Sequence, residues 1–141
     1  MKKFIKIGVI LLLIIIIFCG GFISGKLTYN KPTREIRVGY ETPHQEGVFE
    51  IRNVITDVNN QDKIDNIQQV LAFAKQINNE KFDLGKPNLH LFINSPKEGV
   101  LLIHAKIWFT RDGAIVNMGD YRKVSLTNAK MLKKIVGYKD L

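Results

Sequence analysis

The chain has 141 residues, of which 21 are Lys or Arg, 13 are Asp or Glu and one is Cys, so its formal net charge is +8. A single cysteine excludes a disulfide within the chain, and the length leaves room for one small domain. One apolar run lies near the N-terminus and no second run of comparable length follows it, which excludes a polytopic transporter. The composition therefore predicts one small domain on a membrane anchor rather than a multidomain enzyme or a disulfide-stapled mini-protein.

Residues 7–25 contain no charged side chain. As a helix rising 1.5 Å per residue they would span roughly 28 Å, close to the thickness of the hydrocarbon core of a bilayer. Three of the first six residues are Lys, as is typical of a cytoplasmic N-terminus. Basic residues also follow the run, so its similarity to a secretory signal favours this orientation. We predict a cytoplasmic tail at 1–6, a transmembrane anchor at 7–25 that contacts membrane lipid, and an extracytoplasmic remainder.

Two other fates of the apolar segment stay open. The small residues at Cys19 and Gly21 precede Phe22 with the −3 and −1 spacing that a signal peptidase reads. Cys19 also follows an apolar stretch, as the lipidated cysteine of a bacterial lipoprotein does, but Phe18 stands where that signal requires a small residue. We therefore expect an uncleaved anchor, with cleavage and lipidation as the alternatives.

Residues 26–46 contain two prolines and mixed charges without sustained periodicity, which predicts a stalk with one short extended piece at Glu35–Val38. The folded domain is expected at 47–141. Without the first six residues, 18 Lys and Arg face 13 Asp and Glu. This excess of positive charge is too mild to predict a nucleic-acid partner.

The first part of the domain reads as a strand and a helix. Val48–Thr56 alternates imperfectly between apolar and charged residues, as a half-buried strand does. A helix over Lys63–Ile77, capped by Asn60 or Asp62, would gather an apolar stripe. That stripe consists of Ile64, Ile67, Leu71, Ala74 and Ile77.

Two further strands are predicted at 89–94 and at Val100–Thr110, joined by a turn. Along the second of them, apolar residues recur with period two and predict a core face. This face contains Leu101, Ile103, Ala105, Ile107 and Phe109. Asp112-Gly113 suits a two-residue hairpin turn that would pair Phe109 with Val116.

A last extended segment at Tyr121–Leu126 precedes a helix that Thr127 would cap and Gly137 would end. The predicted order is β-α-β-β-β-α, which defines an α+β domain. An antiparallel sheet with both helices on one face would bury the two helical stripes and one sheet face together. About 95 residues of this kind bury enough surface to fold without a disulfide or a metal.

Several short stretches in this order resemble small membrane-anchored or lipoprotein extracytoplasmic domains of Gram-positive bacteria. The stretches are Ile55-Thr56-Asp57, the Lys63–Ile77 helix, Gly85-Lys86-Pro87-Asn88-Leu89, Phe109 with Gly113-Ala114-Ile115-Val116, and Val124-Ser125-Leu126. The resemblance covers roughly residues 47–137 and implies an envelope location and an α+β fold. Most such domains have no known function, so the resemblance assigns no catalytic residue, cofactor or partner.

The sequence shows no nucleophile motif, no Cys-pair metal motif and no cofactor motif, so we expect neither a catalytic site nor a metal site. Pairing Leu91 with Ile103 would set His90 opposite His104, with roughly 5 Å between their Cβ atoms. No third ligand follows on that strand face. A structural or solvent-exposed histidine pair is therefore favoured over a metal site.

The face of the sheet away from the helices is the predicted binding site. It would present aromatic and basic side chains that suit contact with anionic envelope polymers or an acidic envelope protein. The candidate residues are Phe92, Leu102, His104, Lys106 and Trp108. We predict a non-catalytic envelope binding or interaction module; a small envelope enzyme and a cytoplasm-facing tethered regulator are the alternatives.

Overall fold

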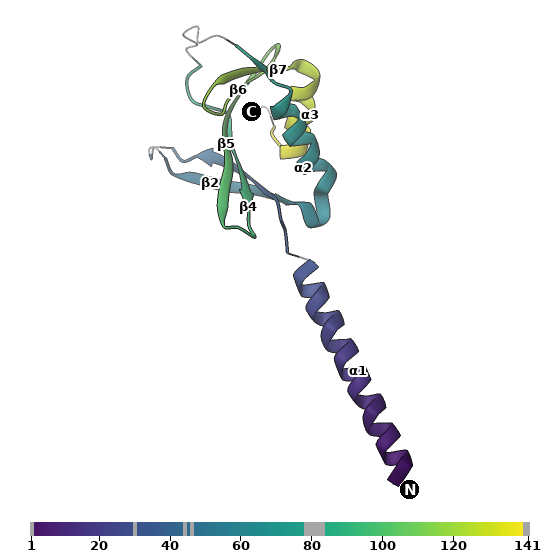
Figure 1. Ribbon diagram of the computed structural model, residues 1–141. Helices are drawn as coiled ribbons and strands as arrows, with labels where there is room; N and C mark the ends of the chain where they lie inside the picture. The colour runs from purple at the N-terminus through teal and green to yellow at the C-terminus, as the bar shows by residue number, and fades with distance from the viewer. Residues whose placement is uncertain (1, 30, 44, 46, 78–83, 140–141) are drawn as a thin grey trace. The chain divides into compact units, whose positions relative to one another are not determined.

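The computed structural model describes residues 2–29, 31–43, 45, 47–77 and 84–139. The chain forms two compact units, Met1–Lys31 and Pro32–Leu141 (Figure 1). The first unit contains one helix, α1 (Lys2–Tyr29), whose apolar side chains are exposed along its length. Ile5–Tyr29 is long and apolar enough to cross a membrane. This confirms an apolar helix at the N-terminus, extending beyond both ends of the predicted 7–25 segment.

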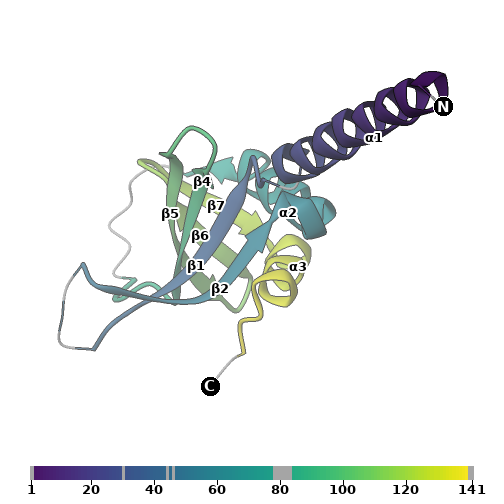
Figure 2. The same ribbon diagram turned by 90° about the horizontal axis from the view of Figure 1, so that it is seen from below.

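The second unit is an α+β domain built on an antiparallel sheet. Its described residues form seven strands in the order β2-β1-β4-β5-β6-β7-β3. The strands are β1 (Glu35–Glu41), β2 (Phe49–Thr56), β3 (Lys75–Gln76), β4 (Leu89–Ser95), β5 (Val100–Thr110), β6 (Gly113–Asn117) and β7 (Tyr121–Ser125). Helices α2 (Asp57–Ala72) and α3 (Leu126–Val136) lie on the same side of the sheet (Figure 2).

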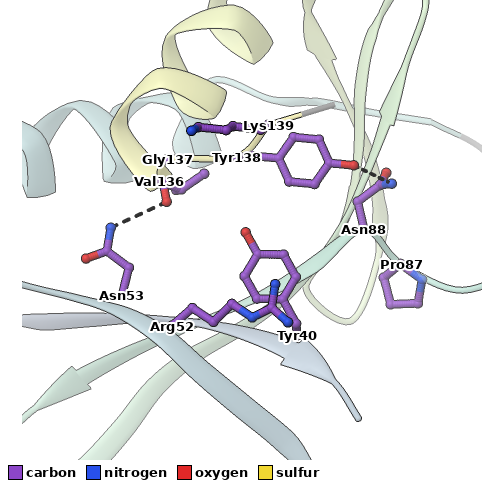
Figure 3. Close-up of a pocket in the computed structure, with 9 residues that line it drawn as sticks. All are labelled: Tyr40, Arg52, Asn53, Pro87, Asn88, Val136, Gly137, Tyr138 and Lys139. Carbon is purple, nitrogen blue, oxygen red and sulfur yellow. Dashed lines mark hydrogen bonds between the residues drawn. The ribbon is translucent and has the colours of Figure 1, made fainter. Parts of the chain in front are cut away.

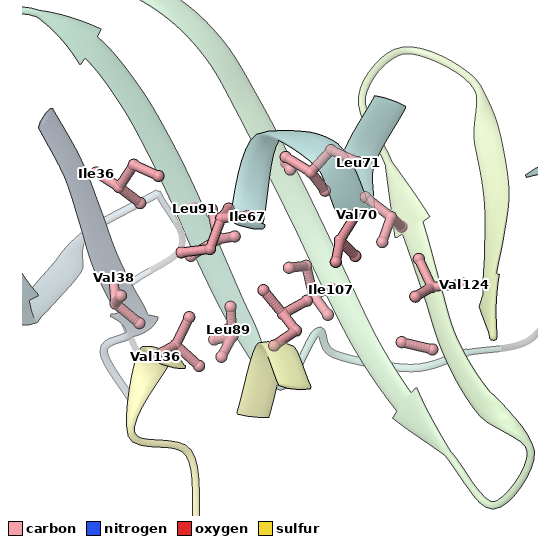
Figure 4. Close-up of a cluster of buried hydrophobic side chains, with 14 of the residues drawn as sticks. Ile36, Val38, Ile67, Val70, Leu71, Leu89, Leu91, Ile107, Val124 and Val136 are labelled. Atoms are coloured by element: carbon pink, nitrogen blue, oxygen red, sulfur yellow. The ribbon is translucent and has the colours of Figure 1, made fainter. Parts of the chain in front are cut away.

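The core lies between this sheet face and the two helices (Figure 4). Alternate residues of the strands point toward the helical stripes and leave almost no accessible surface. Its largest fully buried members are Ile36, Val38, Ile64, Ile67, Val70, Leu89, Leu91, Ile93, Ile107, Val116, Val124 and Leu132. All of them belong to the second unit, so residues 32–141 contain a complete core and we expect them to fold without α1.

The predicted stalk at 26–46 is in part an internal strand. β1 lies between β2 and β4, with Glu35 opposite both Thr56 and Asn94. Ile36 and Val38 are fully buried, while Arg37 between them is exposed. With β1 and β3 added, and with the last predicted strand divided into β6 and β7, the order after the anchor is β-β-α-β-β-β-β-β-α. The predicted β-α-β-β-β-α order is therefore incomplete.

Helix α2 begins and ends earlier than predicted. Its N-cap is Thr56, which makes no side-chain capping bond, and Asn60 lies at a kink inside the helix, so the predicted cap at Asn60 or Asp62 is wrong. Asp57 anchors the start instead, because its carboxylate accepts hydrogen bonds from the backbone N–H groups of Thr33 and Arg34. Ala74 is buried beyond the last helical turn, where the chain turns into β3.

Helix α3 ends where predicted, but its N-cap lies two residues before the predicted one. Ser125, not Thr127, is the N-cap, and its hydroxyl accepts a hydrogen bond from the backbone N–H of Asn128. Gly137 terminates the helix in the left-handed conformation at φ 74°. The backbone N–H of Tyr138 then donates to the carbonyl of Lys133, which turns the chain back toward the sheet.

The register between β4 and β5 differs from the predicted one, and a β-bulge interrupts it. Ile93 pairs with Ile103 and Asn94 pairs with Leu101, so Leu102 is an extra residue in β5. The predicted pairing of Leu91 with Ile103 is therefore wrong; Leu91 pairs with Ala105. Leu101, which was expected in the core, is exposed because the bulge interrupts the alternation of faces.

The β5–β6 turn is also shifted by one residue. Thr110 pairs with Gly113 and Phe109 pairs with Ala114, so Arg111 and Asp112 form the turn and the predicted pairing of Phe109 with Val116 is wrong. Gly113 has φ 144°, and a Cβ there would collide with the backbone carbonyl of Val124. Glycine is required at this position because β7 passes too close for a side chain.

Candidate ligand-binding pocket and the aromatic–histidine cluster

The structure brings together some residues of the predicted binding face and separates others. Phe92 pairs with His104 across β4 and β5, and their rings stack with centroids 4.6 Å apart. Trp108 is only 8% exposed, and its indole N–H donates to the carbonyl of Gly85 at 3.1 Å. Leu102 and Lys106 are exposed. The packed part of the predicted face is therefore Phe92, His104 and Trp108, and the open part is Leu102 and Lys106. The role of these residues in binding stays a prediction.

Two residues of the packed part belong to what we call the aromatic–histidine cluster: Phe49, His90, Phe92 and His104. Phe49 of β2 covers His90, with ring centroids 4.5 Å apart. Gly39 of β1 permits this packing, because a Cβ there would lie 2.9 Å from the Phe92 ring. His90 lies opposite Lys106 rather than His104, yet its Nδ1 is 2.9 Å from Nε2 of His104 on the diagonal.

The cluster holds its histidines in the neutral form. The pKa of His90 is lowered to about 4, mainly by burial; the nearby His104 and Lys106 act in the same direction, and Glu41 opposes them. Burial, followed by the charge of Lys106, also lowers the pKa of His104. His90 is 3% exposed, and its Nε2 has no hydrogen-bond partner among the described residues.

The histidine pair does not form a complete metal site. In the part of the chain that the structure describes, no group of three His, Cys, Asp or Glu side chains could hold a metal ion. Zinc sites in proteins use three or four such ligands. The geometry supports a structural role, in which the imidazoles fill a packed aromatic layer.

A separate pocket of about 650 Å³ opens where β1, β2, the chain before β4 and the end of α3 meet (Figure 3). Figure 3 shows Tyr40, Asn53 and Tyr138 around the same space. The full lining consists of Tyr40, Arg52, Asn53, Pro87, Asn88, Val136, Gly137, Tyr138 and Lys139. We call it the tyrosine–arginine pocket.

Local backbone features build this pocket. Arg52 is the extra residue of a bulge between β1 and β2, and its guanidinium lies 4.7 Å from the centre of the Tyr40 ring. The left-handed Gly137 ends α3 and directs Tyr138 toward the sheet. There the amide of Asn88 donates to the Tyr138 hydroxyl at 3.0 Å. Asn53 donates to the carbonyl of Val136 at 3.4 Å, joining the strand to the helix end.

The electrostatics of the tyrosine–arginine pocket favour an anion. Among the described residues of its lining, Arg52 and Lys139 carry the charges and none is a carboxylate. Glu50 binds Arg52 at 2.9 Å, but this pair is exposed to water, where such contacts are weak and exchangeable. Burial raises the pKa of Tyr40, although Arg52 opposes the effect, so its hydroxyl stays protonated and can donate a hydrogen bond.

Comparisons with protein-family models, with curated proteins and with solved structures found no match for this chain. The site must therefore be interpreted from its own geometry. No sequence motif indicates the pocket, because its lining comes from residues 40, 52–53, 87–88 and 136–139, which are far apart in the chain. The one visible signal, the end of the last helix at Gly137, locates one wall of the pocket but not its opening.

Proposed function

We propose that this chain is a single-pass membrane protein whose C-terminal domain is a non-catalytic binding module outside the cytoplasm, in the cell envelope. α1 supports the anchor, and the three lysines among the first six residues support a cytoplasmic N-terminus. The resemblance to anchored envelope domains of Gram-positive bacteria is consistent with this location.

The tyrosine–arginine pocket carries the proposal for function. It combines two tyrosine rings, which provide apolar contact area, with a guanidinium, an ammonium group and amide donors around one opening. Arginine binds planar anions such as carboxylates and phosphates through paired hydrogen bonds. The pocket therefore suits an anionic ligand with an apolar or sugar body, such as a segment of an acidic envelope polymer.

The lining supports binding rather than catalysis. The lining residues that the structure describes include no Ser, Cys, His, Asp or Glu, which are the usual nucleophiles and general bases. Its charged groups are a guanidinium and an ammonium, hydrogen-bond donors that can orient a ligand and neutralise its charge. Reversible recognition of an anion requires no more than these groups.

The test is calorimetry on the full chain in detergent, with a short poly(glycerol phosphate) oligomer and, separately, inorganic phosphate as probes. Arg52→Ala should weaken binding of the oligomer about tenfold or more, because a charged hydrogen bond is lost. Arg37→Ala is the matched control, since Arg37 is an exposed arginine of β1 that pairs with Glu35 and lies outside the pocket lining. Equal effects of the two substitutions, or no binding of either probe, would refute this site.

Proteolysis of intact bacterial cells tests the orientation. An extracytoplasmic domain should be cut by added protease while a cytoplasmic control protein stays intact. Protection of the domain until the membrane is permeabilised would instead identify a cytoplasm-facing tethered protein.

A further inference from the structure

The hairpin between β4 and β5 exposes three consecutive aliphatic side chains. Val100, Leu101 and Leu102 are 45%, 55% and 53% exposed. In a regular strand, successive side chains alternate between the two faces, so three neighbouring aliphatic residues are not all expected in water. The bulge at Leu102 breaks the alternation here. We call residues 96–102 the hairpin tip.

The hairpin tip lies at the end of the sheet where the chain enters the domain. β1 starts at Glu35, which is opposite Asn94 at the end of β4, and the turn follows directly after β4. In sequence, five residues separate Tyr29, the last residue of α1, from Glu35. A fully extended chain of that length reaches at most roughly 20 Å. A membrane spanned by α1 is therefore within reach of this end of the domain.

We propose that the hairpin tip inserts into the interface of the membrane that α1 spans, with lipid as its occupant. This proposal rests on the anchoring function proposed for α1. The interfacial region of a bilayer accepts aliphatic side chains without demanding a matching shape. The covalent tether supplies a high effective concentration of this surface, so modest contacts are sufficient.

The chemistry of the hairpin tip suits an anionic lipid surface. Lys97 is exposed on the turn, and Lys31 is exposed on the chain leading to β1. Each basic side chain near such a surface contributes an attraction, and Glu98 offsets part of it. Hydrogen bonds from the backbone N–H groups of Glu98 and Gly99 to the carbonyl of Ser95 close the turn. Insertion therefore exposes few unpaired backbone groups to lipid.

An environment-sensitive label locates the hairpin tip. The full chain carries Cys19→Ala and one new cysteine labelled with a nitrobenzoxadiazole dye, and it is reconstituted into vesicles of phosphatidylcholine and phosphatidylglycerol. One variant carries Leu101→Cys. The matched control carries Thr110→Cys at the other end of β5, about 30 Å along the strand.

Doxyl-labelled lipids should quench the dye at position 101 several-fold more than the dye at position 110, and the emission at 101 should shift to the blue. Equal quenching and water-like emission at both positions would overturn the proposal. Alkaline carbonate extraction of the same vesicles tests the anchor separately. A chain released by carbonate overturns the anchor and this proposal together, whereas a retained chain with equal quenching overturns only the contact of the hairpin tip.

Discussion

The buried imidazole of His90 predicts a domain that loses stability in mildly acidic solution. In the unfolded chain this side chain takes up a proton near its ordinary pKa of 6.5. In the folded domain burial delays the proton until about pH 4. Between these values the unfolded state binds more protons, so stability falls as the pH falls.

The magnitude follows from the difference between the two pKa values. Lowering the pKa from 6.5 to about 4 corresponds to about 3 kcal/mol of stability lost by pH 4. His104, whose pKa is also lowered, changes stability in the same direction. Small domains are stable by roughly 5–15 kcal/mol, so the loss is a substantial fraction of the total.

Urea unfolding of residues 32–141 between pH 7.5 and 4.5, followed by circular dichroism, measures this loss. His90→Phe removes both the proton site and the unpaired Nε2, while a ring still fills the space beside Phe49. It should flatten the dependence on pH, while at pH 7.5 the gain from removing the unpaired Nε2 is offset by the loss of the hydrogen bond to Nε2 of His104. An identical loss in wild type and His90→Phe would refute the assignment of the pH dependence to this side chain.

Two further substitutions test the core and the entry of the chain, each by its urea midpoint. Ile107→Ala should destabilise the domain by about 3 kcal/mol, because it leaves a cavity at a fully buried position, whereas the exposed Thr110→Ala should change stability by less than about 0.5 kcal/mol. Asp57→Ala should cost about 2 kcal/mol at pH 7, because backbone donors of Thr33 and Arg34 lose their acceptor. Burial raises the pKa of Asp57, but hydrogen bonds from the Thr33 hydroxyl and from the backbone N–H groups of Thr33 and Arg34 outweigh burial and lower the pKa below its ordinary value. The wild-type advantage over the variant should therefore shrink as the pH falls through the acidic range. Equal cost for Ile107→Ala and Thr110→Ala, or an Asp57→Ala cost that persists at the acid limit, would contradict these expectations.

Apolar periodicity predicted the elements whose pattern is long. The stripe of α2, the alternating stretch of β5 from Ile103 onward and the glycine stop of α3 all follow directly from residue spacing. β1 was predicted only as a short extended piece of a stalk, because its core face contributes only Ile36 and Val38, which lie among charged residues and near prolines. Seven residues of that kind resemble a linker until a partner strand is placed on either side.

Register and site were harder to predict for a related reason. A bulge such as the one at Leu102 adds a residue without changing the composition of the strand, so period-two reasoning continues through it and assigns Leu101 to the wrong environment. The tyrosine–arginine pocket depends on the same kind of event at Arg52, together with the reversal at Gly137. Both are decided by contacts between distant segments, which one sequence does not encode as a local signal.

The bulge at Arg52 also has a consequence for copies of this chain held in one membrane by the proposed anchor. Confinement to a surface brings domains together far more often than dilution in water does, and an open sheet edge is a template for strand pairing between neighbours. β2 is such an edge, and it exposes Ile51 and Val54. The extra residue, Arg52, interrupts the regular pairing of β2 with β1. The strand at the opposite edge of the sheet, β3, has two residues. We therefore expect an irregular edge at β2 and a short edge at β3 to disfavour strand pairing with another copy.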